Sequence, residues 1–109
     1  MRIDHVQVAA PPGCEEEARA FYRGVLGLRE VEKPEALRGR GGVWFEQLHV
    51  GVEQDFRPAR KAHPALAVEN LDALAARIVD VEWDDAVPGV RRFYATDPFG
   101  NRLEFLQGR

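Results

Sequence analysis

Apolar and polar positions alternate in short blocks along the chain, and these blocks predict an order of strands and helices. Residues 2–9 alternate β-branched and polar side chains and stop at the Pro-Pro-Gly sequence of residues 11–13, so they predict a strand. Residues 14–28 carry three glutamates near their start, which favour a helix N-terminus, and continue with apolar residues at helical spacing. We expect a helix there that ends at Gly27.

The blocks that follow predict shorter elements. Residues 29–33 predict a short strand and residues 34–41 a loop. Residues 42–53 are rich in aromatic and β-branched side chains, which is typical of two strands or of one long bent strand. Residues 54–61 form a connector, and we interpret its basic sequence RPARK (residues 57–61) as a solvated linker.

The pattern then starts again. Residues 62–68 predict a strand, in which Pro64 indicates a sheet edge or the start of the strand. Residues 69–80 predict a helix with Asn70 as its N-cap. The remaining elements are a short strand at residues 81–85 and a hairpin at residues 89–108 around the turn DPFGN.

The two halves of the chain are related as an internal repeat. In both halves a histidine precedes an Ala-Arg pair at the same spacing: His5 with Arg19, and His63 with Arg77. The sequence LHV lies near the end of the first half and LEF near the end of the second. His49 and Glu104 therefore occupy equivalent places, as His5 and His63 do.

These motifs resemble the vicinal oxygen chelate superfamily, which includes glyoxalase I, extradiol ring-cleaving dioxygenases, fosfomycin-resistance transferases and bleomycin-binding proteins. The resemblance covers nearly the whole chain and rests on DHVQVA, FYRGVLGL, LHV, AHPALAVENLDAL and DPFGNRLEF. It implies an α+β fold in which one domain, residues 1–109, consists of tandem βαβββ modules that form a cupped mixed sheet. Module one is about residues 1–56 and module two about residues 60–108.

The resemblance also implies a divalent metal ion, held by the first and last strands of the two modules. Carried over residue by residue, the metal ligands are His5, His49, His63 and Glu104. Imidazoles and a carboxylate suit zinc, nickel, iron(II), cobalt or manganese. Since the family often has a glutamate where this chain has His49, Glu46 and Glu53 are the alternatives.

Strand parity supports this set of residues. Successive side chains of a strand point to opposite faces, so His49 lies opposite Leu48 and Val50, and Glu104 lies opposite Leu103 and Phe105. The candidates at His5 and His63 likewise lie away from the more apolar positions of their strands. We expect helices against the apolar faces and a polar pocket on the other side.

The leading functional hypothesis is a metal-dependent lyase or isomerase that acts on a small molecule with two neighbouring oxygens. Its metal would act as a Lewis acid on those oxygens, and Glu104 and His49 are the catalytic candidates. If His49 is not a ligand, it would face the pocket as a general base. The alternatives are an extradiol-type dioxygenase and a metal-free protein that sequesters a small molecule or drug, as bleomycin-resistance proteins do.

Composition narrows the partners. Of 109 residues 45% are hydrophobic, and the net charge of −3 does not favour nucleic acid or an anionic membrane. The N-terminus is too polar for a signal peptide, and the lone Cys14 excludes an internal disulfide. Its predicted place at a helix N-terminus would lower the pKa of the thiol. We expect a cytoplasmic homodimer that binds a small molecule, because two modules need partners to complete a cup.

Overall fold

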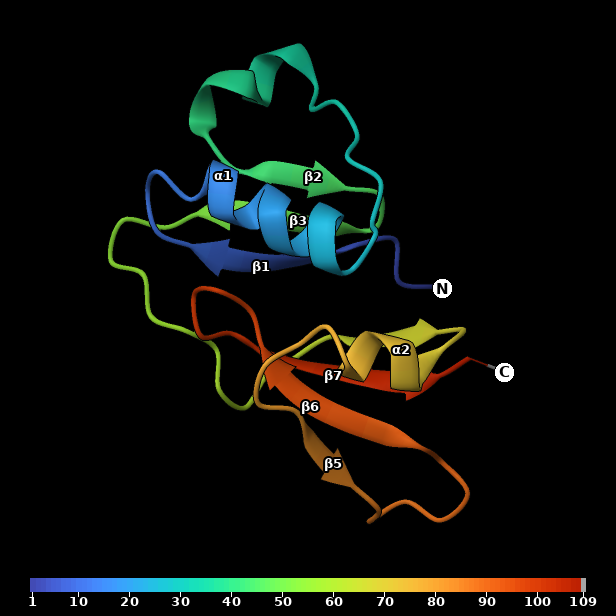
Figure 1. Cartoon of the computed structure of the whole chain (residues 1–109). Coiled ribbons are helices and arrows are strands. Elements are labelled where there is room, and N and C mark those ends of the chain that lie inside the picture. Colours follow the sequence, from blue (N-terminus) through green and yellow to red (C-terminus); the bar gives the residue numbers. More distant parts are fainter. Residues whose placement is uncertain (109) are drawn as a thin grey trace.

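The computed structural model describes residues 1–108, and these residues form two β-sheets that lie one above the other (Figure 1). The first sheet has three strands in the order β1-β3-β2, and the second has four in the order β4-β7-β6-β5. Together with a few short helices, the two related sheets confirm the predicted α+β, glyoxalase-like fold class. No helix in residues 1–108 is long and apolar enough to cross a membrane.

The first module departs from prediction in the stretch between its helix and its hairpin. Its elements are β1 (Val6–Ala10), α1 (Glu15–Ala18), a π-type helix η1 (Arg19–Val25), a 3-10 helix η2 (Glu35–Arg40), β2 (Val43–Phe45) and β3 (Leu48–Val52). The strand predicted at residues 29–33 is reduced to one bridge between Val31 and Trp44. The loop predicted at residues 34–41 contains η2, because Pro34, with its φ of −54°, starts a helical turn in which its carbonyl accepts from the Leu37 N–H.

The second module follows the prediction more closely. Its elements are β4 (Ala65–Val68), α2 (Leu71–Ala75), β5 (Glu82–Asp84), β6 (Arg92–Thr96) and β7 (Arg102–Gln107). The Asn70 side chain caps α2 as expected, by accepting a hydrogen bond of 3.1 Å from the Ala73 N–H. The helix is shorter than residues 69–80, because the Arg77 N–H already bonds three residues back, to the Leu74 carbonyl.

The strand register confirms the internal repeat. β1 pairs in parallel with β3 so that Gln7 lies opposite His49, and β4 pairs in parallel with β7 so that Ala65 lies opposite Glu104. The neighbouring antiparallel strands put Trp44 opposite His49 and Tyr94 opposite Glu104. His49 and Glu104 are therefore equivalent, and each has an aromatic residue beside it.

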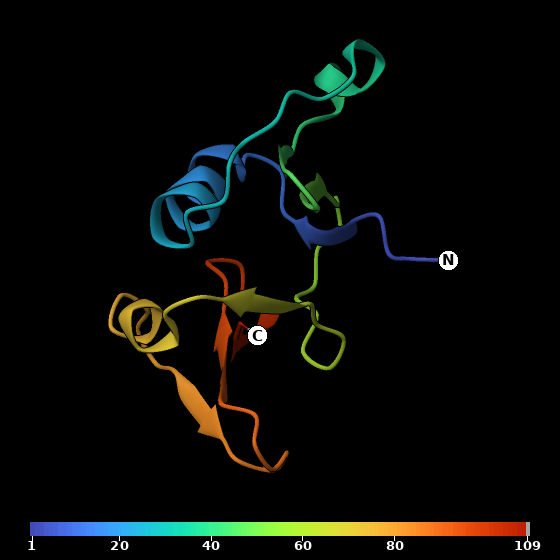
Figure 2. The ribbon, with the colours of Figure 1, turned by 90° about the vertical axis from the view of Figure 1, so that its right-hand side faces the viewer.

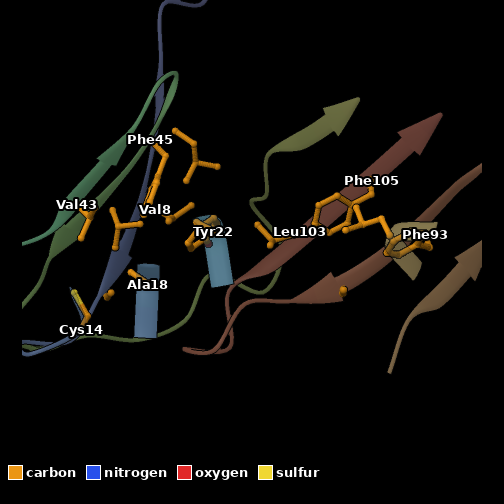
Figure 3. Close-up of a cluster of buried hydrophobic side chains, with 14 of the residues drawn as sticks. Val8, Cys14, Ala18, Tyr22, Val43, Phe45, Phe93, Leu103 and Phe105 are labelled. Atoms are coloured by element: carbon orange, nitrogen blue, oxygen red, sulfur yellow. The ribbon is translucent and has the colours of Figure 1, made fainter. Parts of the chain in front are cut away.

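The helices α1, η1 and α2 lie on the same side of the two sheets (Figure 2). The strand residues on this side, among them Phe45, Val50, Phe93 and Phe105, are buried. Tyr22 from η1 is also fully buried, and Figure 3 shows it between the apolar side chains of the first module and those of the second. This arrangement confirms the parity prediction that helices pack against the apolar faces.

A buried polar network joins the two modules. The Tyr22 hydroxyl donates a hydrogen bond of 2.6 Å to Asp97 in the turn between β6 and β7. The Asn101 side-chain amide donates to the same carboxylate oxygen at 2.9 Å and to the carbonyl of Ala9 in β1 at 2.7 Å. The other oxygen of Asp97 accepts from the N–H groups of Phe99 and Asn101. Burial, followed by the charge of Asp97, raises the pKa of Tyr22, so the phenol remains a neutral donor.

We predict that Tyr22→Phe lowers the free energy of unfolding by about 1–3 kcal/mol, because the variant leaves a buried carboxylate with one donor fewer. Urea denaturation at pH 7 measures this difference. Tyr94→Phe is the matched control, since the Tyr94 hydroxyl has no hydrogen bond within residues 1–108 of the structure. Equal stability of the two variants would show that the network does not hold the modules together.

Candidate functional site

The faces turned away from the helices carry the residues that the sequence singled out. In the first module His5, Trp44 and His49 lie together, and in the second module His63, Tyr94 and Glu104 do. His5 and His63 each lie just before the first strand of their module. The structure thus gathers the four candidate ligands into two pairs, one pair on each module.

In the first module His49 is part of a stack of three rings. Its ring centroid lies 3.9 Å from that of Trp44 and 4.4 Å from that of His5, with interplanar angles of 7° and 18°. The stack leaves His49 only 7% exposed, while the His5 side chain remains half-exposed. Burial, and then the neighbouring His5, hold the pKa of His49 below its ordinary value, so this imidazole is neutral at pH 7.

In the second module a chain of charged groups ends at Glu104. His63 Nε2 lies 3.0 Å from Glu104 Oε1, and Arg92 Nη1 donates to Glu104 Oε2 at 3.2 Å. Arg92 is itself held by Asp84, which accepts from its Nη2 at 2.9 Å. Each oxygen of the Glu104 carboxylate therefore faces a different partner.

The surroundings keep Glu104 ionised although it is 7% exposed. Burial by itself raises the pKa of its carboxyl, but the hydrogen bonds from His63 and Arg92 outweigh burial and hold the pKa below its ordinary value. The module thus presents a carboxylate at neutral pH. Asp84 and Arg92 lie opposite each other in the β5-β6 register. The ion pair between them was not predicted from the sequence. Their opposite charges on two neighbouring predicted strands were the signal that could have indicated it.

The hydrogen bonds of two histidines determine which ring nitrogen is available. His5 Nδ1 lies 2.9 Å from Asp4 Oδ2, and His63 Nδ1 lies 2.9 Å from the carbonyl of Lys61. Both partners can only accept, so Nδ1 carries the hydrogen in each ring and Nε2 of the neutral ring carries the lone pair. Metal-binding histidines in proteins are usually oriented in this way.

The close approach of His63 and Glu104 also suits a shared cation. A lone pair on Nε2 and a carboxylate oxygen repel each other at 3.0 Å unless a positive charge lies between them, either an added proton or a metal ion. Two nitrogens with free lone pairs and one ionised carboxylate are donors that divalent transition metals accept. The residues present therefore fit the metal that the fold family implies.

One chain does not bring all the candidates to a single point. Within residues 1–108 no group of three or more His, Cys, Asp or Glu side chains is close enough to hold a metal ion. His5 and His63 nevertheless line a common cavity of about 520 Å³ between the modules, together with apolar side chains such as Leu28 and Leu66. Within one chain the His5-His49 pair and the His63-Glu104 pair are therefore separate, although His5 and His63 border the same cavity.

The other candidates from the sequence lie elsewhere. Glu46 forms an exposed ion pair of 3.3 Å with Arg29 in the turn between β2 and β3. Glu53 borders a second groove between the modules, described below. The expectation for Cys14 is wrong: burial, followed by the charge of Glu15, raises the pKa of its thiol. Cys14 is a buried core residue and not an activated nucleophile.

Comparisons with known proteins agree with this architecture. The sequence model of one protein family, the Glyoxalase/Bleomycin resistance protein/Dioxygenase superfamily, matches residues 2–105 of this chain. The crystal structure of a protein from Bacillus anthracis, described as a member of the glyoxalase family, is 51% identical over 100% of this chain and 96% of its own, with a TM-score of 0.94. No curated protein matches the chain significantly.

More distant crystal structures share the fold. Lactoylglutathione lyase from Agrobacterium tumefaciens is 22% identical over 98% of this chain and 93% of its own, with a TM-score of 0.73. The fosfomycin resistance protein FosX from Listeria monocytogenes is 15% identical over 100% of this chain and 92% of its own, with a TM-score of 0.70.

The ionised state of Glu104 predicts a pH dependence of stability in metal-free protein. Its pKa is lower in the folded than in the unfolded chain, so its contribution is present above the unfolded value of about 4.3 and is lost as the pH falls through the folded value. We expect Glu104→Gln to lower the free energy of unfolding by about 1–3 kcal/mol at pH 7 and the difference from wild type to shrink towards pH 2.

Urea denaturation between pH 7 and pH 2 measures this dependence. Glu46→Gln is the control, because its exposed ion pair contributes at most about 1 kcal/mol. A Glu104→Gln curve that stays parallel to wild type over the whole range would contradict the assignment.

Proposed function

Because the chain belongs to the Glyoxalase/Bleomycin resistance protein/Dioxygenase superfamily, we propose that it is a divalent-metal-dependent enzyme of the lyase or isomerase type. Members of this superfamily commonly use divalent metals and bind small molecules. The proposed substrate is a small molecule that chelates the metal through two neighbouring oxygens. The proposed ligands are His5, His49, His63 and Glu104.

The observation that carries this proposal is the orientation of His5 and His63, the histidines that precede the first strand of each module. His5 and His63 each engage Nδ1 with an acceptor and leave Nε2 for another partner, and His63 Nε2 already lies beside the ionised Glu104. The His63 Nε2 atom and the Glu104 carboxylate are close enough for a divalent metal ion to take the place of the proton that otherwise joins them. The same orientation in both modules favours one common role.

The residues around the proposed ligands have separate tasks in this chemistry. When bound, the metal would supply Lewis-acid stabilisation of negative charge on the substrate oxygens. Arg92, held by Asp84, keeps the Glu104 carboxylate ionised and turned towards His63. The neutral His49 can accept a proton or donate its lone pair, and stacking on Trp44 holds its ring in place. Glu104 and His49 are thus the proposed catalytic groups.

A homodimer is part of the proposal. The ligand pairs of one chain lie on different modules, and a second copy would let the His5-His49 pair of one chain meet the His63-Glu104 pair of the other. Superfamily members often form dimers. A two-fold axis would create two identical sites from two chains.

Metal-free binding of a planar molecule is the second candidate function. The stack of Trp44, His49 and His5 offers an aromatic surface whose outer member is half-exposed. An aromatic ligand could extend that stack without a metal. Retention of ligand by protein stripped of metal would favour this function over the enzyme.

We predict about one divalent metal per site in wild-type protein as purified, and its loss in His5→Ala and in Glu104→Ala. Elemental analysis measures the content and also identifies the metal. Iron would favour dioxygenase chemistry, while nickel or zinc would favour proton transfer without a redox step. Glu46→Ala, which removes one of the two alternative carboxylates, is the control and should retain the metal. Wild-type metal content in either test variant would remove that residue from the site.

We predict that sedimentation at micromolar concentration shows a species of two chains and that mixed variants restore part of the metal. When His5→Ala and Glu104→Ala chains are unfolded and refolded together, half of the dimers contain both kinds of chain. Each mixed dimer has one intact shared site, so the metal content should return to about one quarter of wild type. No recovery, or a species of one chain only, would place the site within a single chain.

The role of His49 is tested by His49→Gln. If His49 is a ligand, metal affinity in calorimetric titration should fall by about tenfold or more, because loss of an outer-shell partner alone costs that much. If His49 is instead a general base, the metal should remain bound and turnover should slow. Unchanged affinity would therefore reject the four-ligand model.

A further inference from the structure

The basic connector between the modules borders a groove. The groove has a volume of about 450 Å³ and lies between β1, residues 57–62 and the first residue of β7. The polar residues that line it are Gln7, Glu53, Arg57, His63, Asn101 and Arg102. The RPARK sequence, interpreted above as a solvated linker, thus contributes to the wall of a cavity.

The charges of this groove are unbalanced in favour of cations. Arg57 and Arg102 have no carboxylate within ion-pair distance in residues 1–108, whereas Arg91 and Arg92 are paired with Asp72 and Asp84. Glu53 is the one acidic residue lining this part of the structure. Two guanidinium groups against one carboxylate leave this groove positive. On its other side Arg102 also borders a second cavity, whose other charged residues are Arg60, Asp80 and Glu82.

Arg102 is held in position although it lacks an acidic partner. Its guanidinium lies 4.0 Å from the centroid of the Tyr94 ring, and its backbone N–H donates to the carbonyl of Ala59 in the connector at 2.8 Å. Stacking on an aromatic ring limits the freedom of the side chain and leaves the N–H groups at its edge able to donate. Such a guanidinium suits a carboxylate or a phosphate, which it can bind with two parallel hydrogen bonds.

The groove adjoins the proposed metal site. Arg102 and Glu104 are two residues apart on the same face of β7, which separates their Cα atoms by roughly 7 Å. His63 lies on the wall of the groove and also contacts Glu104. A small molecule that chelates a metal beside His63 and Glu104 could therefore reach Arg102 with a group a few bonds away.

We propose that Arg102 and Arg57 bind an anionic group of the substrate, so that the substrate class is a small hydroxy or oxo acid with a second, anionic end. This inference rests on the proposed metal-dependent function and specifies the substrate of the same site. A carboxylate and a phosphate share the chemistry that the guanidiniums recognise.

Calorimetric titration of metal-loaded protein with three probes tests the inference. Lactate, malate and 3-phosphoglycerate share a chelating α-hydroxycarboxylate, while their other ends are a methyl group, a carboxylate and a phosphate. We expect malate, 3-phosphoglycerate or both to bind wild-type protein about tenfold or more tightly than lactate. The stronger of the two identifies the anionic group.

Substitutions of the groove arginines test whether the groove causes the tighter binding of malate or 3-phosphoglycerate relative to lactate. Arg102→Gln should remove most of the advantage over lactate, Arg57→Gln part of it, and Arg102→Lys should retain an intermediate preference because it keeps the charge without the planar fork. Arg91→Gln is the matched control: it removes one positive charge from an exposed ion pair with Asp72 and should keep the wild-type preference.

Equal binding of the three probes to wild-type protein, or a preference unchanged in Arg102→Gln, would overturn the inference and leave the metal site in place. A loss of lactate affinity in Arg102→Gln as large as the loss for malate would also overturn it. Wild-type protein that takes up no divalent metal would instead reject the proposed function and, with it, this substrate class.

Discussion

The buried hydrogen bonds among Tyr22, Asp97 and Asn101 are the constraint on which the arrangement of this molecule depends. The two sheets share no strand pairing, so their relative placement rests on contacts between modules. Asp97 is buried, and its carboxylate is compensated by donors from η1 and from its own turn. A buried charge tolerates little displacement of its donors, because each lost hydrogen bond leaves part of the charge unsolvated. The network therefore fixes how β1 and β7 lie relative to each other, and with them the grooves between the modules.

The internal repeat supplies the same framework twice with different chemistry. The place occupied by neutral His49 in the first module is occupied by ionised Glu104 in the second, and each has an aromatic neighbour on the adjoining strand. The difference in charge between His49 and Glu104 follows from the side chains around each of them. His49 lies between two rings, which desolvate it, whereas Glu104 has two cationic or hydrogen-donating neighbours that outweigh its burial. One half of the molecule thus provides a neutral base or ligand, and the other half an anion.

Much of this could be predicted from the sequence, because it depends on local pattern. Alternation of apolar and polar residues identified the strands and the buried face of each, and the repeat identified His49 and Glu104 as equivalent. The less accurate elements were those whose extent depends on tertiary contacts. The strand expected at residues 29–33 retains one bridge to Trp44, and the helix expected at residues 69–80 is limited to Leu71–Ala75. The residues next to these two segments do not indicate where the strand or the helix ends.

The sequence by itself determined the fold class through the resemblance of its motifs to a known superfamily. It also determined the sidedness of the strands, through side-chain alternation, and the residue types available for a site. Only the tertiary structure decided which groups meet: His5 and Trp44 with His49, and Arg92 with both Asp84 and Glu104. It also showed that burial raises the pKa of Cys14, against the expectation from its place at a helix start. Hydrogen-bond partners, desolvation and charge pairing depend on distances between residues far apart in the chain, and the order of residues along the chain does not specify those distances.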